Sequence, residues 1–239
     1  MGRLITRDTA LFLDFDGTLT GFSDDPDSVR LPPGGFAVLE RLAEKLGGAV
    51  ALVSGRDVRD LASRVPTCLW RAGNHGDLVL APEANEPDGD TSPPPALLAE
   101  LKELTAAHDG VRLEEKARVL TIHTRMARDA SGDVIAKAEA IAARTEGYKL
   151  QLGKDVAEFK PEGVDKGRAI ERLMKEGAFA GRKPLFFGDD ATDEDGFIVC
   201  LHRGGSAVKI GEGKTLAPHR LPDHHAVWDV LKEALHDLA

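Results

Sequence analysis

The stretch LFLDFDGTLT (residues 11–20) places two aspartates directly at the end of an apolar run. Leu11, Phe12 and Leu13 predict a strand buried in the middle of a sheet, and Asp14 and Asp16 follow it. Two carboxylates this close repel each other, so they are usually held together by a cation or a shared proton. The stretch therefore suggests a metal site at the end of a buried strand.

Strand and helix patterns alternate through the first third of the 239-residue chain and again after Pro161. Apolar runs that alternate with helices indicate a parallel sheet covered on both faces, so we expect a doubly wound α/β core. The expected strands are 9–14, 49–53, 68–72, 184–187 and 206–210, and the expected helices are 34–46, 57–65, 166–176, a short one from about Thr192, and 226–238.

The amino-acid composition changes at residues 81–96. This segment contains five prolines and four acids and cannot form the interior of a strand or helix. We interpret this segment as a connection into an inserted α+β module. The module is expected to contain helix 96–108, strands 111–115 and 118–124, helix 132–146, and strands 148–152 and 155–160. The expected domains are a core of residues 1–82 and 162–239 and an insertion of residues 83–161, with hinges at 81–95 and 161–163.

Composition narrows the classes of partner. The net charge of −9 disfavours nucleic acid and anionic membranes, so an anionic substrate would need a local cluster of cations. No apolar run approaches the roughly 20 residues that span a bilayer, and the first ten residues lack the apolar core of a secretory signal. Cys68 and Cys200 have no metal-ligand spacing and are expected to be reduced. We expect a cytoplasmic monomer that acts on a small molecule.

Four polar signals fall at the ends of predicted core strands or at the start of a following helix. They are DFDGT (14–18), SGR (54–56), Lys166 and GDDATDED (188–195). Ligands of α/β sheets bind beyond the carboxyl ends of the strands. Each signal is weak alone, but the four in this order indicate an active site.

This ordered set resembles the haloacid dehalogenase-like (HAD) phosphatases, in the subgroup with an α+β (C2-type) cap between SGR and the lysine. AGNHG (72–76), LEEK…LTIHTR (113–125), AEFKPEGVDKG (157–167) and GDDATDEDGF (188–197) further resemble the trehalose-6-phosphate phosphatases. The resemblance implies Mg²⁺-dependent hydrolysis of trehalose 6-phosphate to trehalose and phosphate, in trehalose biosynthesis, through an aspartyl-phosphate intermediate.

The resemblance also implies a role for each motif residue. Asp14 would be the nucleophile and Asp16 the general acid and base, while Lys166 offsets their charge. The metal would be held by the side chains of Asp14 and Asp189 and the main-chain carbonyl of Asp16. Asp193, one helical turn from Asp189, is preferred to Asp190 as the supporting carboxylate. Ser54 and the amide of Gly55 would hold the phosphoryl oxygens.

Further candidates for substrate binding have plain structural alternatives. Arg56 could grip phosphate or form a salt bridge at a helix start, and His75, next to Asn74, could contact substrate or cap a loop. In the insertion, paired hydrogen bonds to a disaccharide would come from Glu114, Lys116, His123, Arg125, Glu158 and Lys160. The alternative is an exposed sheet face with salt bridges. Alternation with Lys116 favours Glu114 over Glu115 on that face.

The sequence also leaves other functions open. Sucrose-phosphate phosphatase, mannosylglycerate-phosphate phosphatase and phosphomannomutase are capped relatives, and a sugar-phosphate sensor without turnover is a different class. The sensor is disfavoured because both Asp14 and Asp16 are kept, and a protein phosphatase is disfavoured because a cap restricts access.

Some other polar and aromatic residues are expected to have no catalytic role. Asp24, Asp25 and Asp27 are expected in a solvated loop, and Trp70 and Trp228 in the core. No role is assigned to His224 and His225.

Overall fold

The computed structural model describes residues 4–21, 23, 25–87 and 91–238. Asp24, expected in a solvated loop, and residues 88–90 of one expected hinge lie outside the described residues. The chain forms two compact units, which we call the core unit (Met1–Asp88 with Asp165–Ala239) and the inserted unit (Gly89–Val164). The proposed domain boundaries, after residues 82 and 161, fall a few residues from these divisions.

The core unit is built on a sheet in the order β11-β10-β9-β1-β2-β3-β4. Every neighbouring pair is parallel except β3 and β4. The strand β1 (Thr9–Leu13) lies between β9 and β2, and all of its residues are buried, which confirms the strand predicted from the opening stretch. The other strands are β2 (Val50–Val53), β3 (Trp70–Gly73), β4 (Leu78–Leu80), β9 (Lys183–Gly188), β10 (Ser206–Ile210) and β11 (His219–Leu221).

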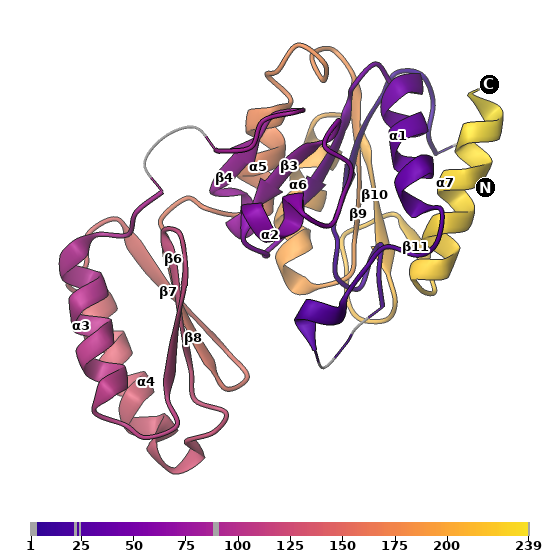
Figure 1. Ribbon diagram of the computed structural model, residues 1–239. Coiled ribbons are helices and arrows are strands. Elements are labelled where there is room, and N and C mark those ends of the chain that lie inside the picture. The colour runs from indigo at the N-terminus through magenta and orange to yellow at the C-terminus, as the bar shows by residue number, and fades with distance from the viewer. Residues whose placement is uncertain (1–3, 22, 24, 88–90, 239) are drawn as a thin grey trace. The chain divides into compact units, whose positions relative to one another are not determined.

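Helices cover both faces of this sheet (Figure 1). The core helices are α1 (Gly35–Lys45), α2 (Val58–Ala62), α5 (Lys166–Leu173), α6 (Glu194–His202) and α7 (His224–Asp237). The crossovers β1-α1-β2 and β9-α6-β10 run toward opposite edges, so their right-handedness puts α1 and α6 on opposite faces. α1 packs against α7, and α5 packs against α6. The predicted doubly wound α/β core is confirmed.

Two strands were missed and several expected helix boundaries were wrong, each for a local reason. The strands β4 and β11 were not predicted, because three residues are too few for a readable pattern. α2 ends at Ala62 rather than 65, since Pro66 disfavours helix at the residue before it. α7 starts at His224, because the carboxylate of Asp223 accepts a hydrogen bond from the amide of Ala226 at 3.0 Å.

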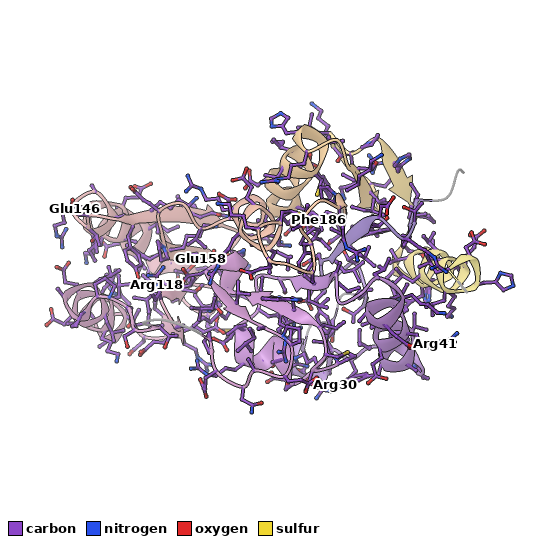
Figure 2. The ribbon with its side chains drawn as sticks, turned by 90° about the horizontal axis from the view of Figure 1, so that it is seen from above. Arg30, Arg41, Arg118, Glu146, Glu158 and Phe186 are labelled. Atoms are coloured by element: carbon purple, nitrogen blue, oxygen red, sulfur yellow. The ribbon has the colours of Figure 1, made fainter. Side chains whose placement is uncertain are left out.

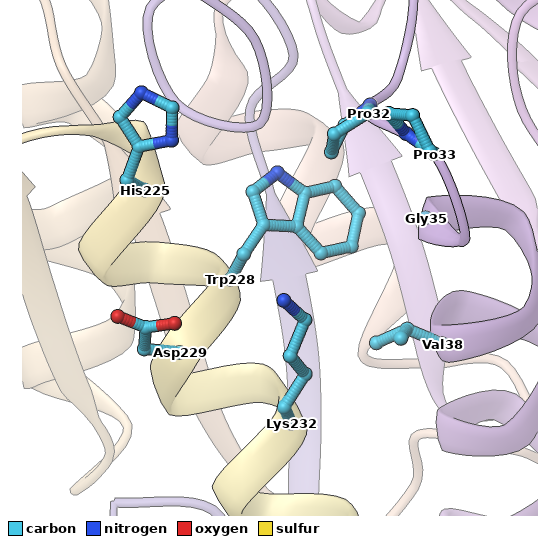
Figure 3. Close-up of a pocket in the computed structure, with 8 residues that line it drawn as sticks. All are labelled: Pro32, Pro33, Gly35, Val38, His225, Trp228, Asp229 and Lys232. Atoms are coloured by element: carbon cyan, nitrogen blue, oxygen red, sulfur yellow. The ribbon is translucent and has the colours of Figure 1, made fainter.

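Aromatic side chains fill the core unit, where Phe186 is fully buried among the strands (Figure 2). Trp70 packs edge-on against Phe179, and Trp228 is 4% exposed and donates its indole N–H to the carbonyl of Leu19 at 2.8 Å. Trp228 is a core residue, as predicted, whereas Trp70 is only partly buried and packs against the core. The ring of Trp228 also walls a hollow of about 120 Å³ between α7 and the start of α1, with Pro33 and Lys232 on its rim (Figure 3).

The inserted unit holds an antiparallel sheet in the order β5-β6-β8-β7. Its strands are β5 (Arg112–Lys116), β6 (Val119–His123), β7 (Tyr148–Gly153) and β8 (Val156–Pro161), and its helices are α3 (Pro95–Ala106) and α4 (Ser131–Ala142). Leu120, Ile122 and Phe159 pack with residues of α3 and α4 in one apolar core. The predicted α+β insertion is confirmed. Among the described residues, no helix is long and apolar enough to cross a bilayer.

The chain also forms short 3₁₀ turns: η1 (Pro26–Ser28), η2 (Asn74–Gly76), η3 (Arg128–Ala130) and η4 (Ala191–Asp193).

Candidate active site

Three acidic side chains meet at the carboxyl edge of the core sheet. Asp14 follows β1, Asp189 follows β9, and Asp193 ends η4. Each offers a carboxylate oxygen, and these oxygens lie within 4.8 Å of one another. The parallel pairing of β1 with β9 produces this meeting, because it aligns Leu13 with Phe187 and so brings the two strand ends together. The sheet register thus joins two motifs that are far apart in the sequence.

The cluster is electrostatically costly without a cation. Burial raises the pKa of Asp14, against the lowering effect of Lys166, and repulsion from Asp189 raises it further. Burial also raises the pKa of Asp189, and burial together with repulsion from Asp14 raises the pKa of Asp193 to about 7. A divalent cation would remove this cost, and carboxylate oxygens are the donors that hard cations such as Mg²⁺ prefer. The donor set therefore fits a hard divalent ion.

Gly17 lets the strand end approach Asp189. Its φ is +76°, and a Cβ at this position would lie 2.3 Å from Asp189 Oδ2. Only glycine combines this left-handed backbone with the absence of a side chain. The hydroxyl of Thr18 lies 3.5 Å from oxygens of both Asp14 and Asp189. The DFDGT motif thus provides both the first carboxylate and the space for the second.

Lys166 supplies the positive charge inside the cluster. Its Nζ donates to Asp14 Oδ1 at 2.9 Å and to Asp193 Oδ1 at 2.7 Å, and all three side chains are at most 5% exposed. Burial opposes the charge, but Asp14 and Asp193 raise the pKa of Lys166 above its usual value. The lysine is therefore a fixed ammonium that touches the first aspartate.

Asp193 and Asp190 are engaged differently. Asp193 Oδ1 accepts from Lys166, and its Oδ2 accepts from the amides of Asp189 and Asp190, both at 2.9 Å. Asp190 caps η4 by accepting from the amide of Thr192 at 2.7 Å. Asp193 thus orients Lys166 and the backbone of Asp189 at once. This geometry suits the supporting role that the sequence suggested for Asp193 rather than Asp190.

Asp16 pairs with Arg56 in this structure. Arg56 Nε and Nη2 each donate to one Asp16 oxygen at 2.6 Å, and Nη1 donates to Asp60 at 3.0 Å. Of the two alternatives for Arg56, the structure displays the salt bridge at the helix start, with an additional bond to the expected acid.

The SGR and AGNHG turns pack against each other beside the acid cluster. Ser54 is buried, and its Oγ accepts from the amide of Arg56 at 3.2 Å. A Cβ at Gly55 would lie 2.7 Å from the ring of His75. Asn74 is fully buried and accepts from the amide of Val58 at 2.9 Å, so it anchors the start of α2. Asn74 therefore has a clear structural task, and His75 lines the turn that holds the expected phosphate-binding glycine.

In the inserted unit, the cross-strand register sorts five of the six remaining candidates onto one sheet face. Glu114 pairs with Thr121, and Thr121 pairs with Glu158. Two residues along, Lys116, His123 and Lys160 share this face by alternation. Glu115 points to the helix face, where it pairs with Lys102 of α3 at 2.9 Å. Arg125 lies beyond the end of β6, exposed in the turn before η3.

Glu114 is held as a charged acceptor on this face. Its Oε2 accepts from His123 Nε2 at 2.9 Å and from Lys116 Nζ at 3.0 Å. The bond from His123 and the charge of Lys116 lower the pKa of Glu114 to about 2, against the effect of burial. Lys160, only 4% exposed, lies 3.8 Å from Glu158. Thr121 belongs to the same row, and strand pairing is what reveals it.

Lys209 was missed by sequence reasoning. It sits in the apolar strand SAVKI, yet it is 4% exposed and its Nζ donates to the carbonyl of Asp189 and to that of Ile210. A single lysine in an apolar strand gives no sign of whether it is buried. Its contact with Asp189 makes it a second cation beside the acid cluster.

A three-layered core, an inserted antiparallel sheet and carboxylates at the strand ends together match the architecture of the haloacid dehalogenase-like class. A solved haloacid dehalogenase-like hydrolase from Bacteroides thetaiotaomicron has the same fold, with a TM-score of 0.70, 16% identity, and coverage of 96% of this chain and 98% of that chain. Within that class, residues 12–220 match the sequence profile of the trehalose-phosphatase family. The chain belongs to the trehalose-phosphatase family.

Individual relatives agree with this assignment. The trehalose-6-phosphate phosphatase of Escherichia coli (strain K12) is 38% identical over 234 residues, covering 93% of this chain and 85% of that protein. A solved trehalose-6-phosphate phosphatase of Aspergillus fumigatus is 25% identical, with a TM-score of 0.70 and coverage of 97% of this chain and 93% of that chain. The family suggests a divalent metal ion, and the acid cluster of Asp14, Asp189 and Asp193 offers carboxylates that could hold one.

Proposed function

We infer that this chain is a phosphatase that hydrolyses trehalose 6-phosphate to trehalose and inorganic phosphate, in trehalose biosynthesis, and we propose Mg²⁺ as its metal. The observation that carries this inference is the position of Asp14, which ends the central strand against Lys166 and beside Asp189. Hydrolysis of phosphate monoesters is among the slowest uncatalysed reactions, so the site must stabilise a large negative charge. A buried lysine and a metal-binding carboxylate pair are suited to that task.

In the proposed reaction, a carboxylate oxygen of Asp14 attacks phosphorus, and the bond from phosphorus to the sugar oxygen breaks. The side chain of Asp16 gives its proton to that oxygen, so trehalose leaves as an alcohol. Asp16 then takes a proton from water, whose oxygen attacks phosphorus and releases phosphate and free Asp14. A bound Mg²⁺ would supply charge neutralisation and orientation between Asp14 and the phosphoryl oxygens.

Side chains and backbone groups around Asp14 are suited to these steps. Lys166 contacts the attacking carboxylate and so offsets the repulsion between Asp14 and the incoming phosphate. Ser54 and the amide of Gly55 are proposed to hold phosphoryl oxygens, because the packed SGR and AGNHG turns fix their backbone. Asp189 and the carbonyl of Asp16 complete the proposed metal ligands.

The polar face of the inserted unit is proposed to select the sugar. Glu114, His123 and Glu158 present charged and polar atoms along neighbouring strands, which suits the paired hydrogen bonds of a disaccharide. Because Glu114 stays ionised at neutral pH, it acts as an acceptor for sugar hydroxyls. Lys116 and Lys160 on this face, and Arg125 beyond the end of β6, are proposed as further sugar contacts.

A substrate panel tests the function. With Mg²⁺, we expect phosphate release from trehalose 6-phosphate with a kcat/KM at least about 10-fold above that for sucrose 6-phosphate, mannosylglycerate phosphate and mannose 6-phosphate. Chelation of the metal is expected to stop turnover, and added Mg²⁺ to restore it. Faster release from sucrose 6-phosphate would reject the proposed specificity, and a need for a bisphosphorylated activator would indicate a mutase.

Replacing Glu114 by Gln tests the sugar site. We expect KM for trehalose 6-phosphate to rise about 10-fold with kcat little changed, because the variant loses a charged acceptor that is used equally in the ground and transition states. Hydrolysis of p-nitrophenyl phosphate, which has no sugar, should keep its KM. The matched control is Glu115→Gln, which changes the neighbouring residue on the opposite sheet face. Equal effects of both variants on KM would contradict the assignment of the polar face.

We propose a cytoplasmic monomer that binds a phosphorylated disaccharide, and the free state of Cys68 and Cys200 is compatible with a reducing compartment.

A further inference from the structure

Arg56 is held between two carboxylates on opposite sides of its guanidinium group. Its Nε and Nη2 donate to the two oxygens of Asp16, each at 2.6 Å, while Nη1 donates to Asp60 Oδ2 at 3.0 Å. The side chain of Arg56 is only 11% exposed. Asp60 therefore holds the guanidinium group of Arg56 through a nitrogen that does not bind Asp16.

Asp60 is itself fixed by a second arginine. Arg64 Nε donates to both oxygens of Asp60 at 3.0 and 2.9 Å, and Nη2 donates to Oδ1 at 2.6 Å. Burial acts to raise the pKa of Asp60, but the bonds from Arg64 and Arg56 more than offset it, so this pKa is lowered. Arg64 is 6% exposed and also donates to the carbonyl of Val29 at 2.7 Å. Asp60 is thus a charged carboxylate with a rigid support.

The spacing of these residues explains how one short segment carries them all. Arg56 lies two residues before α2, Asp60 lies within it, and Arg64 lies two residues after its end. Arg56 also donates to the carbonyl of Pro26 at 3.1 Å, so the two arginines attach the loop at η1 to this segment. Asp60 and Arg64 can therefore hold Arg56 whether or not Arg56 contacts Asp16.

The bidentate pair cannot persist through the proposed reaction. A general acid must carry a proton on one carboxyl oxygen, but Arg56 donates to both oxygens of Asp16 as it would to a carboxylate. Arg56 must therefore release at least one of them when substrate binds. The same guanidinium edge matches two oxygens of a phosphate, and Asp60 holds Arg56 through a different nitrogen, Nη1.

We propose that Asp60, supported by Arg64, is a positioning residue that retains Arg56 at the active site while Arg56 exchanges Asp16 for phosphate oxygens of the substrate. This inference rests on the proposed function, because it assigns Asp16 to acid and base chemistry. Asp60 acts through Arg56 and touches neither substrate nor metal. Its removal should matter only while Arg56 is present.

A double-mutant cycle on the full chain tests this dependence. We expect Asp60→Asn to lower kcat/KM for trehalose 6-phosphate about 10-fold in the wild-type background and less than about 2-fold in an Arg56→Ala background. Asp60→Glu, which keeps the carboxylate, should recover most of the loss. The matched control is Glu44→Gln, which neutralises an exposed carboxylate on another core helix, α1. The control should keep wild-type kinetics.

Binding of inorganic phosphate, measured by calorimetry with Mg²⁺, provides a readout that does not need turnover. We expect Asp60→Asn to weaken phosphate binding about 10-fold, and to do so only when Arg56 is present. If Asp60→Asn fails to fold, Arg64→Lys removes the forked support while keeping the charge, and the same dependence on Arg56 is expected. Equal losses in both backgrounds, or no loss in either, would overturn the inference. An inert wild type that still shows the Arg56-dependent phosphate effect would instead reject the proposed function.

Discussion

Asp14→Asn is expected to lower kcat by about 10⁴-fold or more while leaving the protein folded. An amide lacks the negative oxygen that must attack phosphorus, so no aspartyl phosphate can form. The amide has nearly the same size, and its Oδ1 can still accept the bond from Lys166 that Asp14 now accepts at 2.9 Å. The substitution also removes one charge from a crowded acid cluster, so unfolding should not become easier. Phosphate release and thermal unfolding measure the two effects separately.

The control for this variant is Asp8→Asn, which changes an exposed aspartate just before the opposite end of the same strand. It should keep wild-type kcat. Rapid quenching of the wild-type reaction should also trap phosphate on the protein as an acid-stable, base-labile acyl phosphate, and Asp14→Asn should trap none. Full activity of Asp14→Asn would remove Asp14 from the role of nucleophile.

The strand ends of the core could be predicted because their signals are local. An apolar run that ends in DFDGT or GDDATDED predicts both a buried strand and a polar group at its carboxyl end. The doubly wound order then brings Asp14 and Asp189 together without any knowledge of side-chain conformations. The same reasoning predicted the α+β insertion from its order of helices and strands.

The contacts of individual side chains could not be predicted from the sequence, because they depend on packing between distant segments. Arg56 and Asp16 are 40 positions apart, and the sequence left a phosphate contact and a salt bridge open as alternatives for Arg56. Lys209 looks like any single polar residue in a strand until its ammonium is seen against the carbonyl of Asp189. The short strands β4 and β11 pair at the sheet edges, where three residues carry too little pattern to be recognised.

Lys166→Met is expected to lower kcat about 10²- to 10³-fold and to destabilise the fold in a pH-dependent way. The variant leaves the buried carboxylates of Asp14 and Asp193 without their shared cation, and breaking a buried ion pair by removing one partner costs about 3 kcal/mol or more. Lys183→Met, an exposed lysine at the start of β9, is the matched control and should keep both activity and stability.

The pH dependence of this destabilisation follows from proton linkage. In the metal-free wild type, the folded-state pKa of Asp193 is about 7 against an ordinary 3.8, so the folded state binds more protons than the unfolded state between these values. Stability from this group is therefore fully present below about pH 4 and is lost as pH rises through about 7. Without Lys166 the folded-state pKa values of Asp14 and Asp193 rise further, so the deficit in unfolding free energy should grow from pH 4 to pH 8. Urea unfolding of metal-free Lys166→Met and wild type across this range measures it, and a deficit that is constant or shrinks with rising pH would show that Lys166 does not neutralise these two carboxylates.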